Sequence, residues 1–455
     1  MKKNLLIVST FLLALAYGCK KSEEITVKKQ MKVEKKDAVK YSGDFVRPYY
    51  DLTCEIVKTT PGFFPTQAAR AYGYISIALY EATVQGISSN LSLQGQINGL
   101  AKGMLPKPEH NLEYNWALAA NASIADIMRK MFEINISQEN LTLIDQLESD
   151  NKSALSAYVN TDVIIRSEVF GKAIANAVYE YSKSDGGHHS YLDPFQLPYT
   201  VPTGEDKWVP TGPVHTPVSP KWGENRPFLT ENVTQTMPPP PYLFSSQPGS
   251  ALYKEAFDVY TQVKNNTPEH IAIAKFWADD PKGTCTPAGH TFKILSFLLE
   301  ENNASLAKTA TSYAKMGIAE NDAFIACWKC KFKDNLLRPV TYIQRYIDPA
   351  FTTVIGTPPF PSYISGHSTE IAAASKIFCR EFTNGDSKYK IVDRSQVSYG
   401  LEIRTWNSFN EMADECANSR FYAGIHYQQD NKYGLLQGKK VGEFVNENIK
   451  WPKGI

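Results

Sequence analysis

Lysine, arginine and tryptophan gather near the end of one predicted helix. The stretch from Trp328 to Pro339 reads WKCKFKDNLLRP, so Lys331 and Arg338 are seven residues apart. On a continuous helix they would share one face, about 10 Å apart along the axis, with Trp328 on the same side. A proline disfavours the helical conformation of the residue before it, so Pro339 predicts that the helix ends at Arg338. Two long cationic side chains could then reach one point.

A serine, a glycine and a histidine stand where a loop meets the next predicted helix. Ser365, Gly366 and His367 directly precede a run of small and apolar residues with helical spacing over 368–382. The first N–H groups of a helix lack partners within it and lie at the positive end of its dipole, which suits an anion. Gly366 allows close approach of the backbone, Ser365 adds a hydroxyl, and His367 titrates near neutral pH.

A second histidine follows an arginine near the C-terminus. Arg420 and His426 are six residues apart, which places them on different faces of a straight helix. Either the chain bends at Gly424 between them, or Arg420 lies in the loop that enters the helix. Asp430 follows His426 by four residues, so its carboxylate can contact the imidazole and fix its tautomer. The spacing predicts one oriented histidine beside one arginine.

Each cluster alone has an ordinary structural interpretation. The first could be a solvated basic helix end, the second an N-cap with a surface histidine, and the third an exposed His–Asp pair. Together they predict a site for a tetrahedral oxyanion, because three cations repel one another unless a multiply charged anion lies between them. The arginine fork suits oxyanions. One histidine could bind the central atom while the other moves protons.

The elements that must position these residues are predicted to be helices. Apolar residues recur at helical spacing over 66–86, 114–134, 138–149, 152–184, 251–264, 268–278, 289–303, 305–332, 368–382 and 421–448. Between residues 186 and 250 lie thirteen of the 27 prolines, which excludes helix or central strand there. The same stretch carries Trp208, Trp222 and Phe228, so we expect an ordered loop wrapped over the helices. The predicted fold class is all-α.

Composition excludes two broad classes. The chain has 455 residues, of which 48 are Lys or Arg and 47 are Asp or Glu, for a net charge of +1. A net charge so close to zero argues against a nucleic-acid-binding protein, whose affinity depends on an excess of positive charge. Beyond the first twenty residues no run of eighteen or more apolar residues occurs, which excludes a polytopic membrane protein.

The N-terminus carries an export signal. Lys2 and Lys3 precede an apolar run and then small residues before Cys19, and the segment resembles a bacterial lipobox. We expect cleavage before Cys19, lipidation of its thiol, and a flexible tether over 19–43. An ordinary signal peptide with an incidental cysteine is the alternative. Lys20, in place of aspartate, favours a lipoprotein of the outer membrane of a Gram-negative cell envelope.

The three clusters, in this order and with these gaps, resemble the signature shared by type-2 phosphatidic acid phosphatases, bacterial acid phosphatases and vanadium-dependent haloperoxidases. One departure is Ile364, where that superfamily usually has proline. Trp328 and Phe360 match aromatic positions of the halide pocket in the haloperoxidase branch. The length and the segments 208–228 and 276–280 are similar to that branch as well. The resemblance implies helical bundles of this type, with the catalytic bundle in 251–455 and an N-terminal helical region in 44–250 after a signal peptide over 1–18.

The resemblance also implies an orthovanadate cofactor and a role for each residue. His426 would be the axial ligand of the metal, and His367 the acid–base group. Asp430 would support His426, and a carboxylate of Asp279 or Asp280 would support Arg338 or His367. The oxygens of vanadate would be held by Lys331, Arg338, Ser365, the Gly366 amide and Arg420.

The implied activity is halide oxidation by hydrogen peroxide to hypohalous acid, which halogenates a small organic acceptor. Iodide is the easiest halide to oxidise and chloride the hardest, so we rank iodide above bromide above chloride. A secreted acid phosphatase with a phosphohistidine intermediate is the alternative enzyme, because the same site would bind phosphate. A third possibility is a non-catalytic lipoprotein that captures an oxyanion or glycan.

Overall fold

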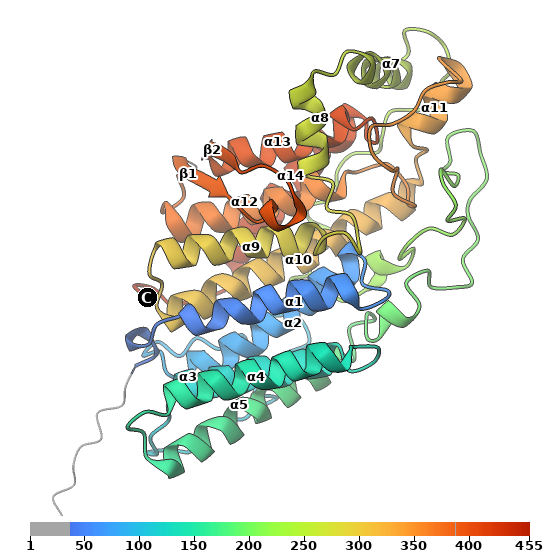
Figure 1. Ribbon diagram of the computed structural model, residues 1–455. Coiled ribbons are helices and arrows are strands. Elements are labelled where there is room, and N and C mark those ends of the chain that lie inside the picture. The colour runs from blue at the N-terminus through green and yellow to red at the C-terminus, as the bar shows by residue number, and fades with distance from the viewer. Residues whose placement is uncertain (1–36, 387) are drawn as a thin grey trace, which may run out of the picture. The chain divides into compact units, whose positions relative to one another are not determined.

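Helices supply nearly all regular structure of this chain (Figure 1), as the sequence predicts. The computed structural model describes residues 37–386 and 388–455. The α-helices are α1 Arg47–Thr59, α2 Pro65–Val84, α3 Trp116–Met131, α4 Gln138–Leu155, α5 Thr161–Ser182, α6 Glu231–Thr234, α7 Ala251–Lys264, α8 Pro268–Phe276, α9 Thr286–Glu301, α10 Leu306–Asp334, α11 Pro339–Tyr346, α12 Gly366–Phe382, α13 Phe409–Tyr422 and α14 Gln428–Asn448. Short 3₁₀ helices are η1 Ala38–Lys40, η2 Asp44–Val46, η3 Ser190–Leu192, η4 Trp222–Glu224 and η5 Val397–Tyr399. Two strands, β1 Lys388–Asp393 and β2 Arg404–Ser408, form an antiparallel hairpin that the helical patterning did not predict.

Helix α10 lies at the centre of the packing. It contacts α2, α9, α12 and α14, and almost every residue along it is buried. A helix that is buried on all sides has other helices packed closely against it, and small residues allow α10 to approach α2. A Cβ atom added at Gly317 would lie 2.9 Å from the Cα atom of Gly73, so the two helices can touch here only through glycine.

Helices α12 and α14 approach each other even more closely. Gly434, Gly438 and Gly442 recur every four residues on one side of α14 and face the backbone of α12. A Cβ atom at Gly438 would lie 2.0 Å from the carbonyl oxygen of Thr369, where no side chain fits. This glycine stripe brings the start of α14 beside the start of α12, and therefore brings the second and third sequence clusters together.

The helix expected over 421–448 is two helices. Helix α13 ends at Tyr422 and α14 begins at Gln428. Gly424 has a positive φ of 79°, and a Cβ there would lie 2.8 Å from Val263, so glycine is required at this turn. The chain therefore bends at Gly424, which was one of the two alternatives. Apolar residues keep helical spacing across this turn, so periodicity alone does not show the break between α13 and α14.

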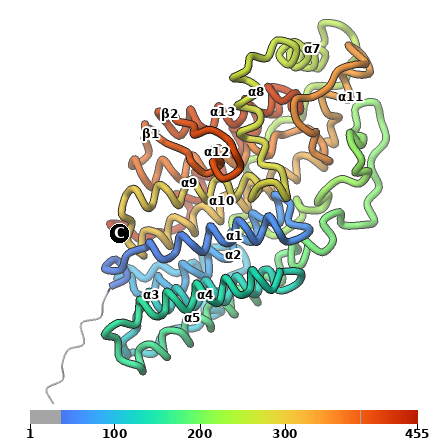
Figure 2. The backbone as a smooth tube through the Cα atoms, in the orientation of Figure 1, coloured from blue at the N-terminus to red at the C-terminus, as the bar shows by residue number. Residues whose placement is uncertain are grey.

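The proline-rich segment is ordered and mostly irregular, as expected, but the exclusion of helix from it is wrong. One turn of α-helix, α6, and the short η3 and η4 lie within it, and α6 falls between Pro227 and Pro238, where the sequence has no proline. The segment runs irregularly from the end of α5 to the start of α7 (Figure 2), and its rings Trp208, Trp222 and Phe228 are all buried. The amide of Trp208 donates to the carbonyl of Asn335 (2.8 Å), and the Asp322 carboxylate accepts from the amide of Phe228 (2.8 Å). These bonds hold the loop against α10 and against the chain that follows it.

The N-terminal predictions fall largely outside the described part of the chain. The signal peptide, Cys19 and residues 19–36 of the expected tether belong to the undescribed residues. Among residues 37–386 and 388–455, no helix is both long enough and apolar enough to span a bilayer. The division of the folded chain near residue 250 stays a prediction.

Candidate active site

Lys331 lies in the last turn of α10 with its ammonium group buried. Nζ donates to the carbonyl oxygens of Pro361 and Ser362, both at 2.9 Å. Both carbonyls belong to the loop that leads into α12, so the lysine ties α10 to that loop. Burial, with the charge of Arg338 adding to it, lowers the pKa of Lys331 to about 7. A bound anion would restore its charge.

Arg338 does not continue the helix of Lys331, and the shared-face expectation is wrong in this respect. Helix α10 ends at Asp334 because Asn335 takes the left-handed conformation, with φ 52°. Arg338 is extended (φ −74°, ψ 153°) and directly precedes Pro339, the first residue of α11. Its side chain nevertheless reaches the site, because Nε donates to Phe360 O (2.8 Å) and Nη1 to Ile425 O (2.9 Å).

Ser365, Gly366 and His367 form the start of α12, as expected. Ser365 is the N-cap, and its hydroxyl oxygen accepts from the Ser368 amide at 3.3 Å. Gly366 and His367 are the first helical residues, so their N–H groups have no carbonyl acceptor within the helix. Burial and the charge of Arg420 lower the pKa of His367 well below its usual value. His367 is therefore a neutral imidazole in this arrangement.

The tautomer of His426 follows from its neighbours. The guanidinium Nη1 of Arg338, which can only donate, lies 3.1 Å from Nε2 of His426. The proton must then be on Nδ1, which donates to Oδ2 of Asp430 at 2.9 Å. Burial raises the pKa of Asp430 to about 7, while the Ser362 hydroxyl (2.6 Å) and the charge of Lys331 favour its carboxylate. Nε2 is thus the unprotonated, basic nitrogen of His426, and it accepts a hydrogen bond from Arg338.

Arg420 approaches from the last turn of α13. It is buried, and its Nη1 donates to the carbonyl oxygen of Trp277. Burial followed by the charges of Arg338, Lys331 and Arg420 lowers the pKa of His426 well below its usual value. Charged groups from the end of α10, from the chain before α11 and from the end of α13 therefore all act on one imidazole.

Two aromatic rings line the cationic side chains. The Phe360 ring centroid lies 5.1 Å from Lys331 Nζ and 5.0 Å from Arg338 Cζ, within the range of cation–π attraction. The rings of Trp328 and Phe360 are 5.0 Å apart, and Lys331 Nζ lies 5.8 Å from the Trp328 ring. The two residues that the sequence singled out as an aromatic pair do lie together beside the lysine.

Three buried nitrogen atoms of the site have no hydrogen-bond partner among the described residues: Arg338 Nη2, His367 Nε2 and Arg420 Nε. Leaving such groups unpaired is costly, about 1–3 kcal/mol each and more for a charged group. All three come from residues that the sequence places around an oxyanion. Together with the free N–H groups at the start of α12, they fit a tetrahedral guest such as vanadate.

One buried group beside the site was missed by the sequence reasoning. His290 lies between two carboxylates, with Nδ1 3.0 Å from Asp279 Oδ2 and Nε2 2.8 Å from Asp393 Oδ2. Burial opposes its charge, but the two carboxylates prevail and raise the pKa of His290 well above its usual value. Asp393 belongs to the unforeseen hairpin, so no local pattern could have found this pairing.

Asp279 and Asp280, the two carboxylates expected to support the site, act on different groups. Asp279 Oδ2 lies 3.9 Å from His367 Nε2, while its closer partners are His290 and Gln396. Asp280 carries a negative charge that acts on Arg420. Neither contacts Arg338 by a hydrogen bond or ion pair within the described ranges 37–386 and 388–455.

Comparison with known proteins agrees with this arrangement. A family model described as the VCPO second helical-bundle domain matches residues 346–451. No curated protein sequence matches the chain significantly. A solved structure described as the first bacterial vanadium-dependent iodoperoxidase is 31% identical, with a TM-score of 0.80, over 90% of this chain and 97% of that one.

Two further solved structures share the fold. A holo-type bacterial vanadium-dependent chloroperoxidase has a TM-score of 0.63 at 15% identity, over 86% of this chain and 93% of that one. An apo-type bacterial vanadium-dependent chloroperoxidase has a TM-score of 0.67 at 15% identity, over 91% of this chain and 100% of that one. These two structures show the shared fold, and the match to the iodoperoxidase, at 31% identity over 90% of this chain, establishes that the chain belongs to the vanadium-dependent haloperoxidase family.

Proposed function

We propose that this enzyme uses bound vanadate to oxidise iodide with hydrogen peroxide, releasing hypoiodous acid or an equivalent iodinating species. The observation that carries the proposal is the set of three unpartnered buried nitrogen atoms on Arg338, His367 and Arg420. The iodoperoxidase at 31% identity supports iodide as the preferred halide. Bromide and then chloride would follow, because they are progressively harder to oxidise. The product would halogenate a small organic acceptor.

Each residue of the site would hold or serve the cofactor in a distinct way. Nε2 of His426 is the basic nitrogen available to the metal, and Asp430 keeps it so. Arg338, Arg420 and Lys331 would balance the charge of the oxygens, and Ser365 with the Gly366 amide would donate to them. Bound vanadate supplies a Lewis acid that activates peroxide without a change of metal oxidation state.

His367 would move the proton. Its Nε2 atom is unpartnered among the described residues, and its low pKa keeps it able to accept a proton from hydrogen peroxide. The charge on Asp279, 3.9 Å away, would stabilise the imidazolium that results. Trp328 and Phe360 would exclude bulky substrates from the lysine and leave room for a small halide. The protein would thus orient the cofactor and the halide, shield them from water, and hold one proton at His367.

Halide-by-halide kinetics test the proposal. The purified protein is stripped of vanadate and assayed with peroxide and iodide, bromide or chloride, with and without added orthovanadate. We expect activity to depend on vanadate and kcat/KM to fall from iodide to chloride. A phosphomonoesterase activity that vanadate inhibits, with no halide oxidation, would reject the proposal in favour of an acid phosphatase.

We further propose that the enzyme is an exported lipoprotein anchored through Cys19 to the outer membrane. The charged start, the short apolar run and the cysteine at its end support this. The lipid would be the only attachment to the membrane. Expression with labelled fatty acid should label the native chain, whereas a Cys19→Ser variant should remain unlabelled. Label retained by that variant would refute the anchor.

A further inference from the structure

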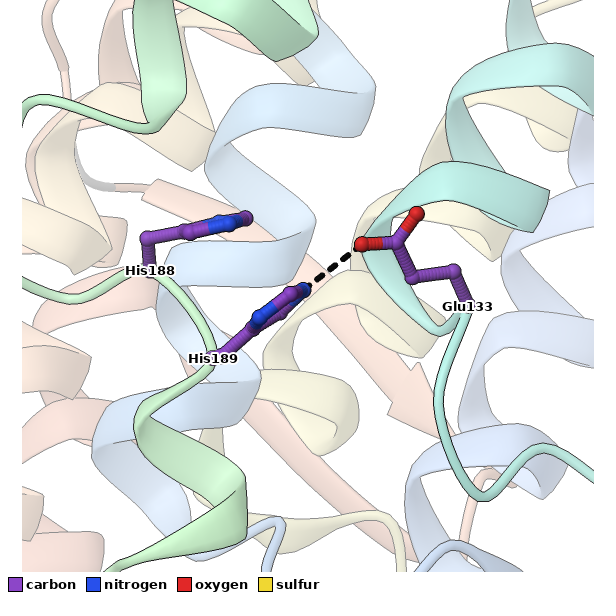
Figure 3. A group of neighbouring side chains, drawn as sticks. All are labelled: Glu133, His188 and His189. Carbon is purple, nitrogen blue, oxygen red and sulfur yellow. Dashed lines mark hydrogen bonds and ion pairs between the residues drawn. The ribbon is translucent and has the colours of Figure 1, made fainter.

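We propose that Glu133, His188 and His189 form a Zn²⁺ site separate from the vanadate site (Figure 3). Glu133 lies just beyond the end of α3, and the two histidines lie between α5 and η3. No hydrogen bond, ion pair or ring contact of the described residues joins these three side chains to the residues assigned to vanadate. The site would therefore fasten the start of the proline-rich loop to the end of α3.

The spacing of the ligand atoms suits a small metal ion. One oxygen of Glu133 and one nitrogen of each histidine all lie within 4.8 Å of one another. Tetrahedral zinc with bonds of 2.0–2.1 Å needs neighbouring ligand atoms about 3.3 Å apart. The His189 Nε2 to Glu133 Oε1 distance is 2.7 Å, so this pair would open by about 0.6 Å. The ring centroids of His188 and His189 are 3.7 Å apart with 27° between the ring planes, so the two rings would tilt until both nitrogens face the metal ion.

The contacts of the ligands also favour metal binding. His188 makes no hydrogen bond within residues 37–386 and 388–455, so its ring nitrogens are available to a metal ion. His189 already contacts Glu133, so the carboxylate and this imidazole face each other.

Neighbouring groups orient the ligands and set the local charge. The Tyr179 hydroxyl donates to the same Glu133 oxygen that His189 contacts. Lys130 and Lys183 lie over the Tyr179 ring, and Arg70, which also acts on His188, is neutralised by Asp185 at 2.7 Å. Lys130 is itself paired with Asp126 and Lys183 with Glu180, so the positive charges around the site are balanced.

The donor set selects the metal. Two imidazole nitrogens and one carboxylate oxygen suit zinc, whereas calcium and magnesium require six or more oxygens. Three protein ligands leave a fourth position for water. The side chains of Glu133 and His189 are 39% and 30% exposed, so an ion can enter from solvent.

Zinc titration of the vanadate-loaded enzyme, without a polyhistidine tag, tests the site. After chelator treatment and reloading with vanadate, calorimetry should show one Zn²⁺ bound per chain and zinc should raise Tm. Changing either ligand histidine, as His188→Ala or His189→Ala, should weaken binding by about 100-fold, and Tyr179→Phe by about 10-fold. The exposed His215, in the same loop, provides the matched control His215→Ala, which should bind as the wild type does.

Iodide oxidation should be unchanged in all these variants, which separates this site from the proposed function. Zinc binding that survives in both His189→Ala and Glu133→Gln would overturn the proposal. So would the absence of stoichiometric zinc binding to the wild type, because Glu133 and His189 would then be a hydrogen-bonded pair only.

Discussion

The Nδ1 atom of His426 donates a 2.9 Å hydrogen bond to Oδ2 of Asp430, which leaves Nε2 unprotonated and basic. Replacing Asp430 by alanine removes the acceptor that fixes this tautomer. We expect vanadate affinity to fall by about 10–100-fold. Asp430→Asn should lose less, since an amide oxygen can still accept. Equilibrium dialysis with metal analysis measures both, and equal affinities for Asp430→Ala and wild type would contradict the assignment.

Changing the two histidines of the site should have different effects. His367→Ala removes a proton acceptor and should lower kcat for iodide by about 10²–10⁴-fold, with vanadate affinity within about tenfold of wild type. His426→Ala should abolish vanadate retention and with it activity. Far-ultraviolet circular dichroism should show an intact helical fold in both. Vanadate lost equally from both variants would mean that the two roles are not distinct.

The lowered pKa of Lys331 predicts a pH dependence of anion binding. The lysine must be protonated to balance vanadate, but burial lowers its pKa to about 7 in the anion-free protein. Binding therefore takes up a proton above that pH and weakens as pH rises. The ratio of wild-type to Lys331→Met affinity should be level below about pH 7 and fall about tenfold per pH unit above it. The ratio cancels the titration of vanadate itself, and a level ratio to pH 9 would refute the prediction.

The face of the Phe360 ring should help to hold the cationic groups of Lys331 and Arg338 in place. It lies about equally far from Lys331 and Arg338, at 5.1 and 5.0 Å. Phe360→Leu keeps an apolar side chain but loses the cation–π attraction, worth about 0.5–2 kcal/mol per cation. Because this attraction is already present before vanadate binds, we expect its loss to lower Tm, and vanadate to bind up to about 30-fold more weakly (about 2 kcal/mol) because the cations are no longer held in place. Phe332→Leu, whose ring instead contacts Tyr199, is the control and should bind normally.

His290 should matter for stability more than for binding. Its replacement by glutamine leaves Asp279 and Asp393 without a buried cation and should cost about 3–5 kcal/mol of unfolding free energy. The folded pKa of His290 lies above its unfolded value, so its stabilisation is fully present below about pH 6.5 and is lost as pH rises through the folded pKa.

Urea unfolding across the pH range measures this effect. The difference between wild type and His290→Gln should be largest at acid pH and narrow toward alkaline pH. His215→Gln, at an exposed position, should follow the wild type throughout. A difference that widens with rising pH would show that His290 is neutral in the folded protein.

The sequence by itself determined the helical class and singled out the residues that we propose to hold the oxyanion. Helical periodicity, the Ser365 cap and the proline after Arg338 are local signals, and local backbone preference obeys them. Lys331 and His426 could be singled out because their chemistry is rare in combination. The bend at Gly424 was one of two alternatives that the sequence allowed, because glycine readily takes a positive φ.

Only the tertiary structure decided how these residues meet. The left-handed turn at Asn335 redirects the chain so that Arg338 returns from outside the helix of Lys331. The glycine stripe on α14 is meaningful only once α12 lies against it. The contact between His290 and Asp393 joins residues over a hundred positions apart. Such contacts depend on which surfaces become buried together, and burial is a property of the whole packed chain that no local pattern contains.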